Sequence, residues 1–198
     1  MKLKKILATG ILLVALSAMS VGSALASAFF IADLTGDQEV PSPVSTSAFG
    51  HAALYLNAAQ TRLEISIELF GLDLDGLQTA DPSDDLIGLH IHRAPKGSNG
   101  PVVFGIIGPD HDTTGDFFMD AAAGKIFSAW DMVETGAGTS LAAELPHLFA
   151  FDLYLNVHTV GVPSGEIRGQ ITPEPGSMLL VGLGLIGFTA LFRKRTEK

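Results

Sequence analysis

One stretch of the chain reads Arg62-Leu63-Glu64-Ile65-Ser66-Ile67-Glu68-Leu69-Phe70. Apolar and polar residues alternate strictly along it, which predicts a β-strand with one face in a core and the other in water. On this register Ile65 is buried and Glu64 faces solvent. A shift of one residue would reverse the two faces, so the pattern also predicts the pairing of this strand.

The same period-two alternation recurs on both sides of this stretch. It covers residues 51–57, 89–92, 151–158 and 166–171, and residues 29–34, 102–107 and 125–130 are further candidate strands. A short helix is expected at residues 140–144, with Thr139 or Ser140 as its cap. About seven or eight antiparallel strands predict an all-β Greek-key sandwich or barrel. The expected core contains Leu63, Ile65, Ile67, Leu89, Ile91, Leu153, Leu155 and Val157.

The first 26 residues have the layout of a secretory signal peptide. Lys2, Lys4 and Lys5 precede a mostly apolar segment at residues 6–18, and Ala24-Leu25-Ala26 is a cleavage site of the A-x-A type. Ala26-Ser27-Ala28 is an alternative cleavage site. The predicted parts of the chain are therefore a signal peptide at 1–26, one domain at 27–172 and a tail at 173–198.

The tail reads Pro173-Glu174-Pro175-Gly176, then an apolar run over residues 178–192, then Arg193-Lys194-Arg195. As a helix the run would be about 22 Å long, against a hydrocarbon core of about 30 Å, which suits a temporary membrane anchor. The basic cluster belongs on the cytoplasmic side, so the domain lies outside. An ordinary tail anchor with a chance Pro-Glu-Pro is the alternative.

In detail this tail resembles the bacterial PEP-CTERM signal, from Pro173 to Arg195. The resemblance implies processing by an exosortase-type transpeptidase that recognises Pro173, Glu174 and Pro175. It also implies export, a transient membrane anchor, and final residence at the cell surface or in an extracellular polysaccharide matrix. Polysaccharide and other surface components are thus expected partners.

Charge and cysteine content narrow the class of partner. The predicted domain has five Lys and Arg residues against 19 Asp and Glu residues, a net charge of −14 with neutral His. Such a domain repels nucleic acid and anionic lipid. The chain has no Cys, so the fold depends on its core and not on disulfides.

Three motifs in the domain resemble the CHRD domain, named after chordin. They are Asp37-Gln38-Glu39-Val40-Pro41, then His90-Ile91-His92 leading into Asn99-Gly100-Pro101-Val102-Val103, and Tyr154-Leu155-Asn156-Val157-His158-Thr159 leading into residues 165–171. The resemblance runs from about Phe30 to Ile171. It names a domain and implies no general activity.

Residue parity places several polar groups together. His90 and His92 are two residues apart and share one face of a strand. His158, Glu166 and Arg168 are likewise out of phase with the core residues of their strands and are expected on wet faces. One interpretation is a set of solvated histidines that brace the loops. The other is a metal site, because imidazole suits copper, zinc and nickel and three His leave one position open.

The order of these residues is also similar to copper/zinc superoxide dismutase, a Greek-key sandwich. The resemblance implies that His90, His92 and His158 bind copper and that Arg168 attracts an anion. His111 is a further candidate ligand, but the zinc-binding His cluster is otherwise missing and the family disulfide cannot form. Holding copper is therefore expected more than dismutase activity.

Other chemistry has weaker support. The chain has no G-x-S-x-G elbow, Walker motif or G-x-G-x-x-G motif. His51 and His147 are expected to be structural. Acidic loops could bind calcium, although no EF-hand spacing occurs. The sequence thus predicts an exported structural or adhesive module without a catalytic step. A copper-binding protein with a redox or storage role is the second hypothesis, and a calcium-stabilised adhesion module is the third.

Overall fold

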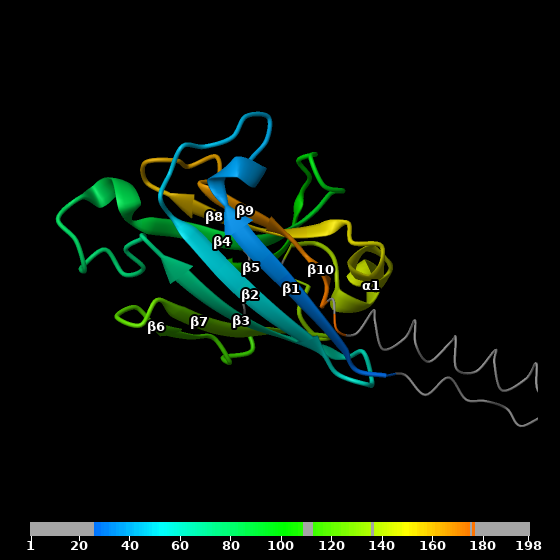
Figure 1. Ribbon diagram of the computed structural model, residues 1–198. Coiled ribbons are helices and arrows are strands. Elements are labelled where there is room, and N and C mark those ends of the chain that lie inside the picture. Colours follow the sequence, from blue (N-terminus) through cyan, green and yellow to red (C-terminus); the bar gives the residue numbers. More distant parts are fainter. Residues whose placement is uncertain (1–25, 109–112, 136, 175, 177–198) are drawn as a thin grey trace, which may run out of the picture.

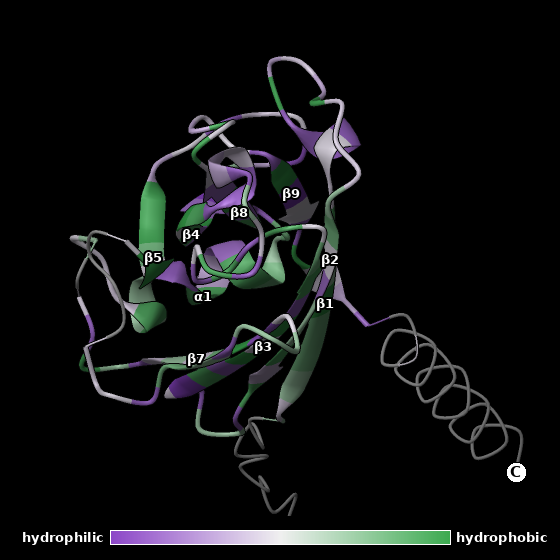
Figure 2. Cartoon of the chain, turned by 90° about the vertical axis from the view of Figure 1, so that its left-hand side faces the viewer, coloured by the Kyte–Doolittle hydropathy of each residue, from purple (hydrophilic) through white to green (hydrophobic). Residues whose placement is uncertain are grey.

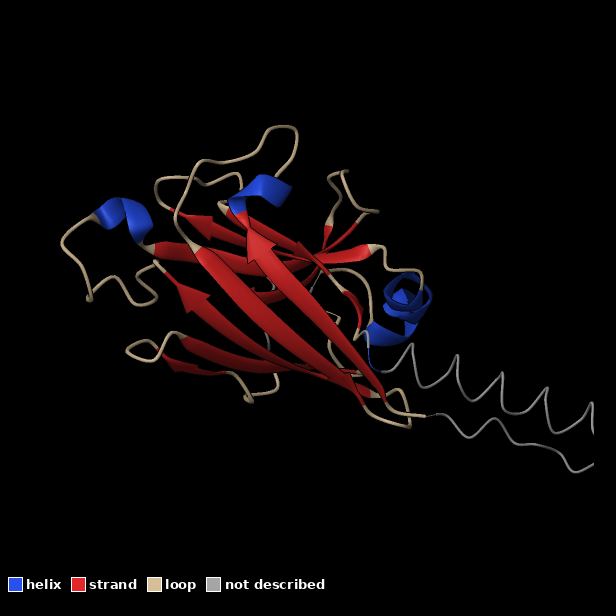
Figure 3. Cartoon of the chain, in the orientation of Figure 1, coloured by secondary structure: helices blue, strands red, loops and turns tan. Residues whose placement is uncertain are grey.

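The computed structural model describes residues 26–108, 113–135, 137–174 and 176. Ten strands in these residues form one antiparallel sheet in the order β5-β4-β8-β9-β1-β2-β3-β7-β6, with β10 paired to β1 (Figures 1 and 3). The strands are β1 (Ala28–Thr35), β2 (Phe49–Leu56), β3 (Arg62–Phe70), β4 (Leu86–Arg93), β5 (Val102–Ile107), β6 (Phe118–Asp120), β7 (Lys125–Asp131), β8 (Leu153–Thr159), β9 (Ile167–Gln170) and β10 (Thr172–Pro173). The all-β, antiparallel class is confirmed.

The sheet curls, so that strands far apart in its order face each other across the core (Figure 2). Phe104 on β5 stacks on Trp130 of β7, with ring centroids 4.9 Å apart and planes 11° apart. The contact joins one edge of the sheet to the strand next to the other edge. Two parts of one curled sheet thus face each other across the core, as the two separate sheets of a sandwich would.

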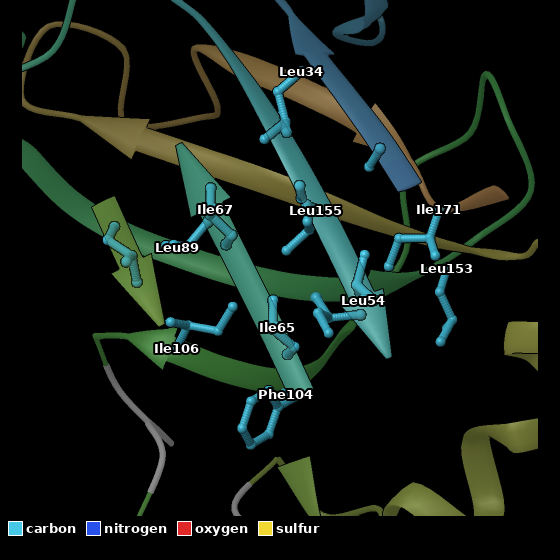
Figure 4. Close-up of a cluster of buried hydrophobic side chains, with 14 of the residues drawn as sticks. Leu34, Leu54, Ile65, Ile67, Leu89, Phe104, Ile106, Leu153, Leu155 and Ile171 are labelled. Carbon is cyan, nitrogen blue, oxygen red and sulfur yellow. The ribbon is translucent and has the colours of Figure 1, made fainter. Parts of the chain in front are cut away.

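The predicted register is confirmed. All eight predicted core residues are buried, and they join one apolar cluster with Leu34, Leu54, Phe104, Ile106 and Ile171 (Figure 4). Ile65 is fully buried, whereas Glu64 is partly exposed. Alternation therefore located the inner face of each long strand.

The helices are short. Besides the 3-10 turns η1 (Gly36–Gln38) and η2 (Pro82–Asp84), α1 (Leu141–Phe149) packs Leu141 and Leu148 into the core. Ser140, and not Thr139, is its cap, because the Ser140 hydroxyl accepts a hydrogen bond from the Ala143 amide. Among the described residues no helix is both long and apolar enough to span a membrane. The predicted signal peptide and membrane helix lie outside those residues.

Three details of the strand prediction were wrong. β8 begins at Leu153, because Phe151 has a left-handed φ of 63° and ends the turn after α1. β6 was missed because it is only three residues long. β10 was also missed, and Pro173 pairs with Phe30, so the tail motif begins inside the last strand and not beyond it.

Candidate metal centre

Two neighbouring strands, β4 and β8, bring the predicted histidines to one face of the sheet. In the ladder between β4 and β8, His90 pairs with Asn156, His92 with Tyr154, and His158 with Gly88. Partners in an antiparallel ladder point to the same side, so the three imidazoles gather above one patch of sheet. Gly88 lies opposite His158 and leaves space beside it.

The imidazoles lie within reach of one another. The ring centroids of His90 and His158 are 5.1 Å apart, those of His90 and His92 are 5.8 Å apart, and those of His92 and His158 are 6.0 Å apart. One ring nitrogen from each residue can be chosen so that all three lie within 4.8 Å of one another. Nitrogens that share a tetrahedral ion at 2.0–2.1 Å are about 3.3 Å apart, so small side-chain rotations would suffice.

Backbone carbonyls orient two of the rings. His92 Nδ1 lies 3.0 Å from the Gly100 carbonyl oxygen, and His158 Nδ1 lies 3.0 Å from that of Pro163. A carbonyl oxygen only accepts, so each Nδ1 is the protonated donor. Each Nε2 then keeps its lone pair, which is the arrangement that metal-binding histidines adopt.

These lone pairs have no protein partner. The Nε2 atoms of His92 and His158 and both ring nitrogens of His90 are inaccessible to solvent, and none has a hydrogen-bond partner within the described part of the chain. A buried polar atom left unsatisfied costs about 1–3 kcal/mol. Three such residues therefore form a cluster of buried ring nitrogens that no described protein group satisfies.

Electrostatics keep the three rings neutral. Burial, together with the neighbouring His158 and His92, lowers the pKa of His90 to about 4. Burial also lowers the pKa of His92 and of His158, although hydrogen bonds to the Gly100 and Pro163 carbonyls oppose the shifts. The neutral imidazole is the form that binds a metal ion.

Arg168 lies on the same face of the sheet as the three histidines, because it pairs with Asn156, which pairs with His90. It is buried. Its guanidinium carbon lies 3.4 Å from the ring centroid of Tyr154, and that ring stacks on His92 at 4.9 Å. Its amino groups donate to the Asn99 side chain at 3.0 Å and to the Ser98 carbonyl oxygen at 2.7 Å. Arg168 thus holds the loop of residues 94–101, which carries the Gly100 carbonyl oxygen that orients His92.

The expectation of a wet face was wrong for Glu166 and Arg168, whereas the three histidines are partly exposed. Glu166 and Arg168 are buried, and so are Tyr154, Asn156 and Gln170 on the same face. The loop 94–101 and the segment 36–48 cover this face, since the Asn99 amide donates to the Val40 carbonyl oxygen and Thr46 donates to Glu166. In the sequence, a polar strand face that loops cover shows the same period-two alternation as a polar strand face that water covers.

The remaining predicted residues lie elsewhere or outside the described residues. His111 and Pro175 fall outside them. Pro173 belongs to β10, and the Glu174 amide donates to the Phe29 carbonyl oxygen. His51 contacts Asp33 at 2.8 Å on an exposed strand face, away from the three histidines in the ladder order.

An acidic group at Asp73, Asp84 and Asp85 is a second set of possible ligands. The Asp73 carboxylate, however, accepts hydrogen bonds from the backbone amides of residues 75–79. Although burial alone would raise its pKa, the amides of Thr79, Gln78, Gly76 and Asp75 lower it to about 2. Both oxygens are used to organise the loop, which favours a structural role over calcium ligation.

Two glycines that sequence reasoning missed shape the centre. A Cβ atom on Gly88 would lie 2.9 Å from the Cε1 atom of His90, and one on Gly108 would lie 3.1 Å from its Nε2 atom. Parity could have indicated Gly88, which is two residues before His90. The carbonyl groups of Gly100 and Pro163 give no signal in the sequence, because every residue has one.

Comparison with protein-family models gives two matches. The CHRD domain matches residues 30–171, and the PEP-CTERM protein-sorting motif matches residues 172–195. No curated protein and no solved structure matches the chain.

Proposed function

The chain belongs to the CHRD domain family, and on that premise we propose that it is an exported surface protein whose domain holds a transition-metal ion, with copper preferred. The sorting motif supports export and processing by an exosortase-type enzyme. In this proposal residues 1–26 are a signal peptide, residues 27–172 are the domain, and residues 173–198 are a sorting tail that anchors the domain outside the cytoplasm until it is processed.

One observation supports metal binding above the others: three neutral histidines have buried, unpartnered nitrogens, and one ring nitrogen from each lies within 4.8 Å of the other two. A site of three neutral nitrogens suits the later first-row ions, and affinity for such sites peaks at copper in the divalent series. Three protein ligands leave a position open for a further ligand.

The centre is proposed to bind and store copper and not to turn over a substrate. His90, His92 and His158 are the ligands, and the Gly100 and Pro163 carbonyl oxygens fix the tautomers of two of them. A storage role needs only affinity and shielding from water, and the covering loops supply the shielding.

Metal titration of the purified mature domain tests the proposal. Isothermal calorimetry with Cu²⁺, Zn²⁺ and Ni²⁺, checked by elemental analysis after dialysis, should give one site that prefers copper. His158→Ala should weaken copper binding at least about 100-fold, the upper range for disturbing a ligand shell. His147→Ala is the matched control and should bind as the parent does.

Folding of each variant is checked by circular dichroism. The proposal is wrong if His158→Ala is folded and retains parental copper affinity, or if the parent binds none of the three ions. In either case ordered water fills the space between the rings, and the histidines brace the loops as the structural interpretation holds.

A further inference from the structure

The outer face of β1, β2 and β3 carries two aromatic pairs. His90, His92 and His158 lie on other strands, β4 and β8. Phe49 stacks on Phe70 with ring centroids 4.7 Å apart and planes 16° apart. The ring centroids of Phe29 and Tyr55 are 4.8 Å apart. Phe29, Phe49 and Phe70 are each between 41% and 48% exposed, which is high for large apolar side chains. Phe49 and Tyr55 are six residues apart on β2, so the pairs stand about 20 Å apart at 3.3 Å per residue.

Between the two pairs the face has a shallow depression with polar groups at its sides. The depression is lined by Ile31, Asp33, His51, Ala52, Ala53, Ser66 and Glu68. The side chains of Asp33 and Glu68 remain accessible, with exposed fractions of 72% and 46%. His51 Nδ1 contacts Asp33 at 2.8 Å, and Glu68 pairs with Lys125 of β7 at 3.1 Å. The strip therefore combines aromatic ends with a hydrogen-bonding middle.

The long strands β1, β2 and β3 lie side by side, and no helix or other strand within the described residues covers their outer face (Figures 1 and 3). Their inner side chains join the core, and α1 packs into that core from the other side of the sheet. Clusters of exposed apolar side chains mark interaction surfaces, and each of the two aromatic pairs is such a cluster.

We propose that this strip, defined by Phe29, Tyr55, Phe49, Phe70 and the depression between them, binds a neutral polysaccharide chain. A sugar ring has apolar C–H groups on its faces and hydroxyl groups around its rim. The faces pack on aromatic rings, and the hydroxyl groups donate to carboxylates such as Asp33 and Glu68. An extended, rather flat polymer suits a flat strip with an aromatic contact at each end.

Other occupants fit less well. Nucleic acid, anionic lipid and acidic polysaccharide would meet the carboxylates of Asp33, Glu64 and Glu68 on a domain that is already strongly acidic. A second copy of the chain in a two-fold dimer would bring the same carboxylates face to face. An apolar helix would bury them without partners.

The inference requires only that the domain is exported, as the sorting motif supports, and is independent of the metal centre. Affinity electrophoresis of the mature domain in native gels tests it, with four neutral polymers: a soluble cellulose derivative, a β-1,3-glucan, an α-glucan and a galactomannan. Alginate and heparin serve as acidic polymers. We expect at least one neutral polymer to retard the protein and neither acidic polymer to do so.

The paired variant Phe49→Ser/Phe70→Ser should lose at least about tenfold in affinity for that polymer. The matched control is Leu77→Ser/Val160→Ser, which removes two exposed apolar side chains in loops outside the strip and should bind as the parent does. His158→Ala should also bind the polymer normally, which separates this inference from the metal proposal.

Three results would overturn the inference. The first is no retardation by any of the four neutral polymers. The second is parental affinity in the folded Phe49→Ser/Phe70→Ser variant. The third is a parent dimer in size-exclusion chromatography that the paired variant converts to a monomer, because the strip would then be a contact between copies of the chain.

Discussion

The Nδ1 atom of His158 lies 3.0 Å from the carbonyl oxygen of Pro163, five residues further along the chain. This contact fixes the tautomer of the late histidine, because the carbonyl oxygen can only accept. The loop between β8 and β9 thus aims the Nε2 lone pair of His158 at His90 and His92. The hairpin that carries His158 also sets the direction of its ring, so the fold itself orients this proposed ligand.

The lowered His pKa values predict how copper affinity depends on pH. Because burial lowers the pKa of all three rings, and that of His90 to about 4, protons compete with the metal at a lower pH than they would at exposed histidines. Copper affinity should therefore begin to decline at a lower pH than in a peptide with exposed histidines, and His90 should still be unprotonated at pH 5. Competition titrations at fixed pH measure it, with a peptide of residues 86–93 as reference. A peptide-like decline starting near pH 6.5 would contradict the burial of the rings.

Gly88→Ala should weaken metal binding without unfolding the domain. The added Cβ would lie 2.9 Å from His90 Cε1, so the ring has to turn away from the other two. We expect a loss of about tenfold or more in copper affinity, in the range for disturbed ligand orientation. Gly97→Ala is the control for added volume: no atom lies within 4 Å of the new Cβ, and its left-handed φ of 82° adds a backbone cost that Gly88 does not have. Equal copper affinity in the two variants would show that Gly88 is not needed for space.

The core prediction separates neighbouring residues on β3. Ile65→Ala should lower the free energy of unfolding by about 2–5 kcal/mol, since it leaves a cavity among fully buried side chains. Glu64→Ala should change it by no more than about 0.5 kcal/mol, because Glu64 is partly exposed and its contact with Arg62 is 3.5 Å long. Urea unfolding gives both values, and comparable losses in the two variants would contradict the register.

Much of the fold could be predicted because long half-buried strands carry their own signal. Ile65 and Leu155 follow alternation, and the resemblance in sequence extends over the whole domain. The three histidines could also be selected, because parity put His90 and His92 on one face. What could not be predicted is the cover over that face. Arg168 and Asn156 look like solvated residues in sequence, and only the loops that fold over them, tied by contacts such as that of Asn99 with Val40, make them buried.

The sorting tail gives a prediction on processing. In a host with the matching exosortase-type enzyme, surface or secreted protein should lack residues 178–195, as intact mass would show. Replacing Pro173, Glu174 and Pro175 with Ala should leave the full-length form in the membrane. Because Pro173 pairs with Phe30, the change should also slightly lower stability, so thermal unfolding is measured alongside. A tail that stays on the parent protein in such a host would identify it as an ordinary anchor.

Glu39 gives the last prediction, on stability and pH. It is only 4% exposed, and burial raises its pKa to about 7, although the positive charge of Arg168 and a hydrogen bond with Asn156 oppose the shift. Its Oε1 atom and the Asn156 Oδ1 atom both lie beside Gly165, so a protonated Glu39 could donate to that oxygen. The folded state binds this proton more tightly than the unfolded state, where the pKa is near 4.5. The stabilisation is therefore complete below pH 4.5 and is lost as the pH rises through about 7.

Glu39→Gln keeps the shape and a donor but removes the titration. Relative to the parent, the variant should gain up to about 3 kcal/mol at pH 8, from 1.36 kcal/mol per pKa unit, and much less at pH 4.5. Asp37→Asn, an exposed carboxylate two residues away, is the matched control and should show no such trend. Urea unfolding of the three proteins from pH 4.5 to 8 measures the differences. If the gap between Glu39→Gln and the parent did not widen with pH, Glu39 would be ionised in the folded domain, and Arg168 would hold it as a carboxylate.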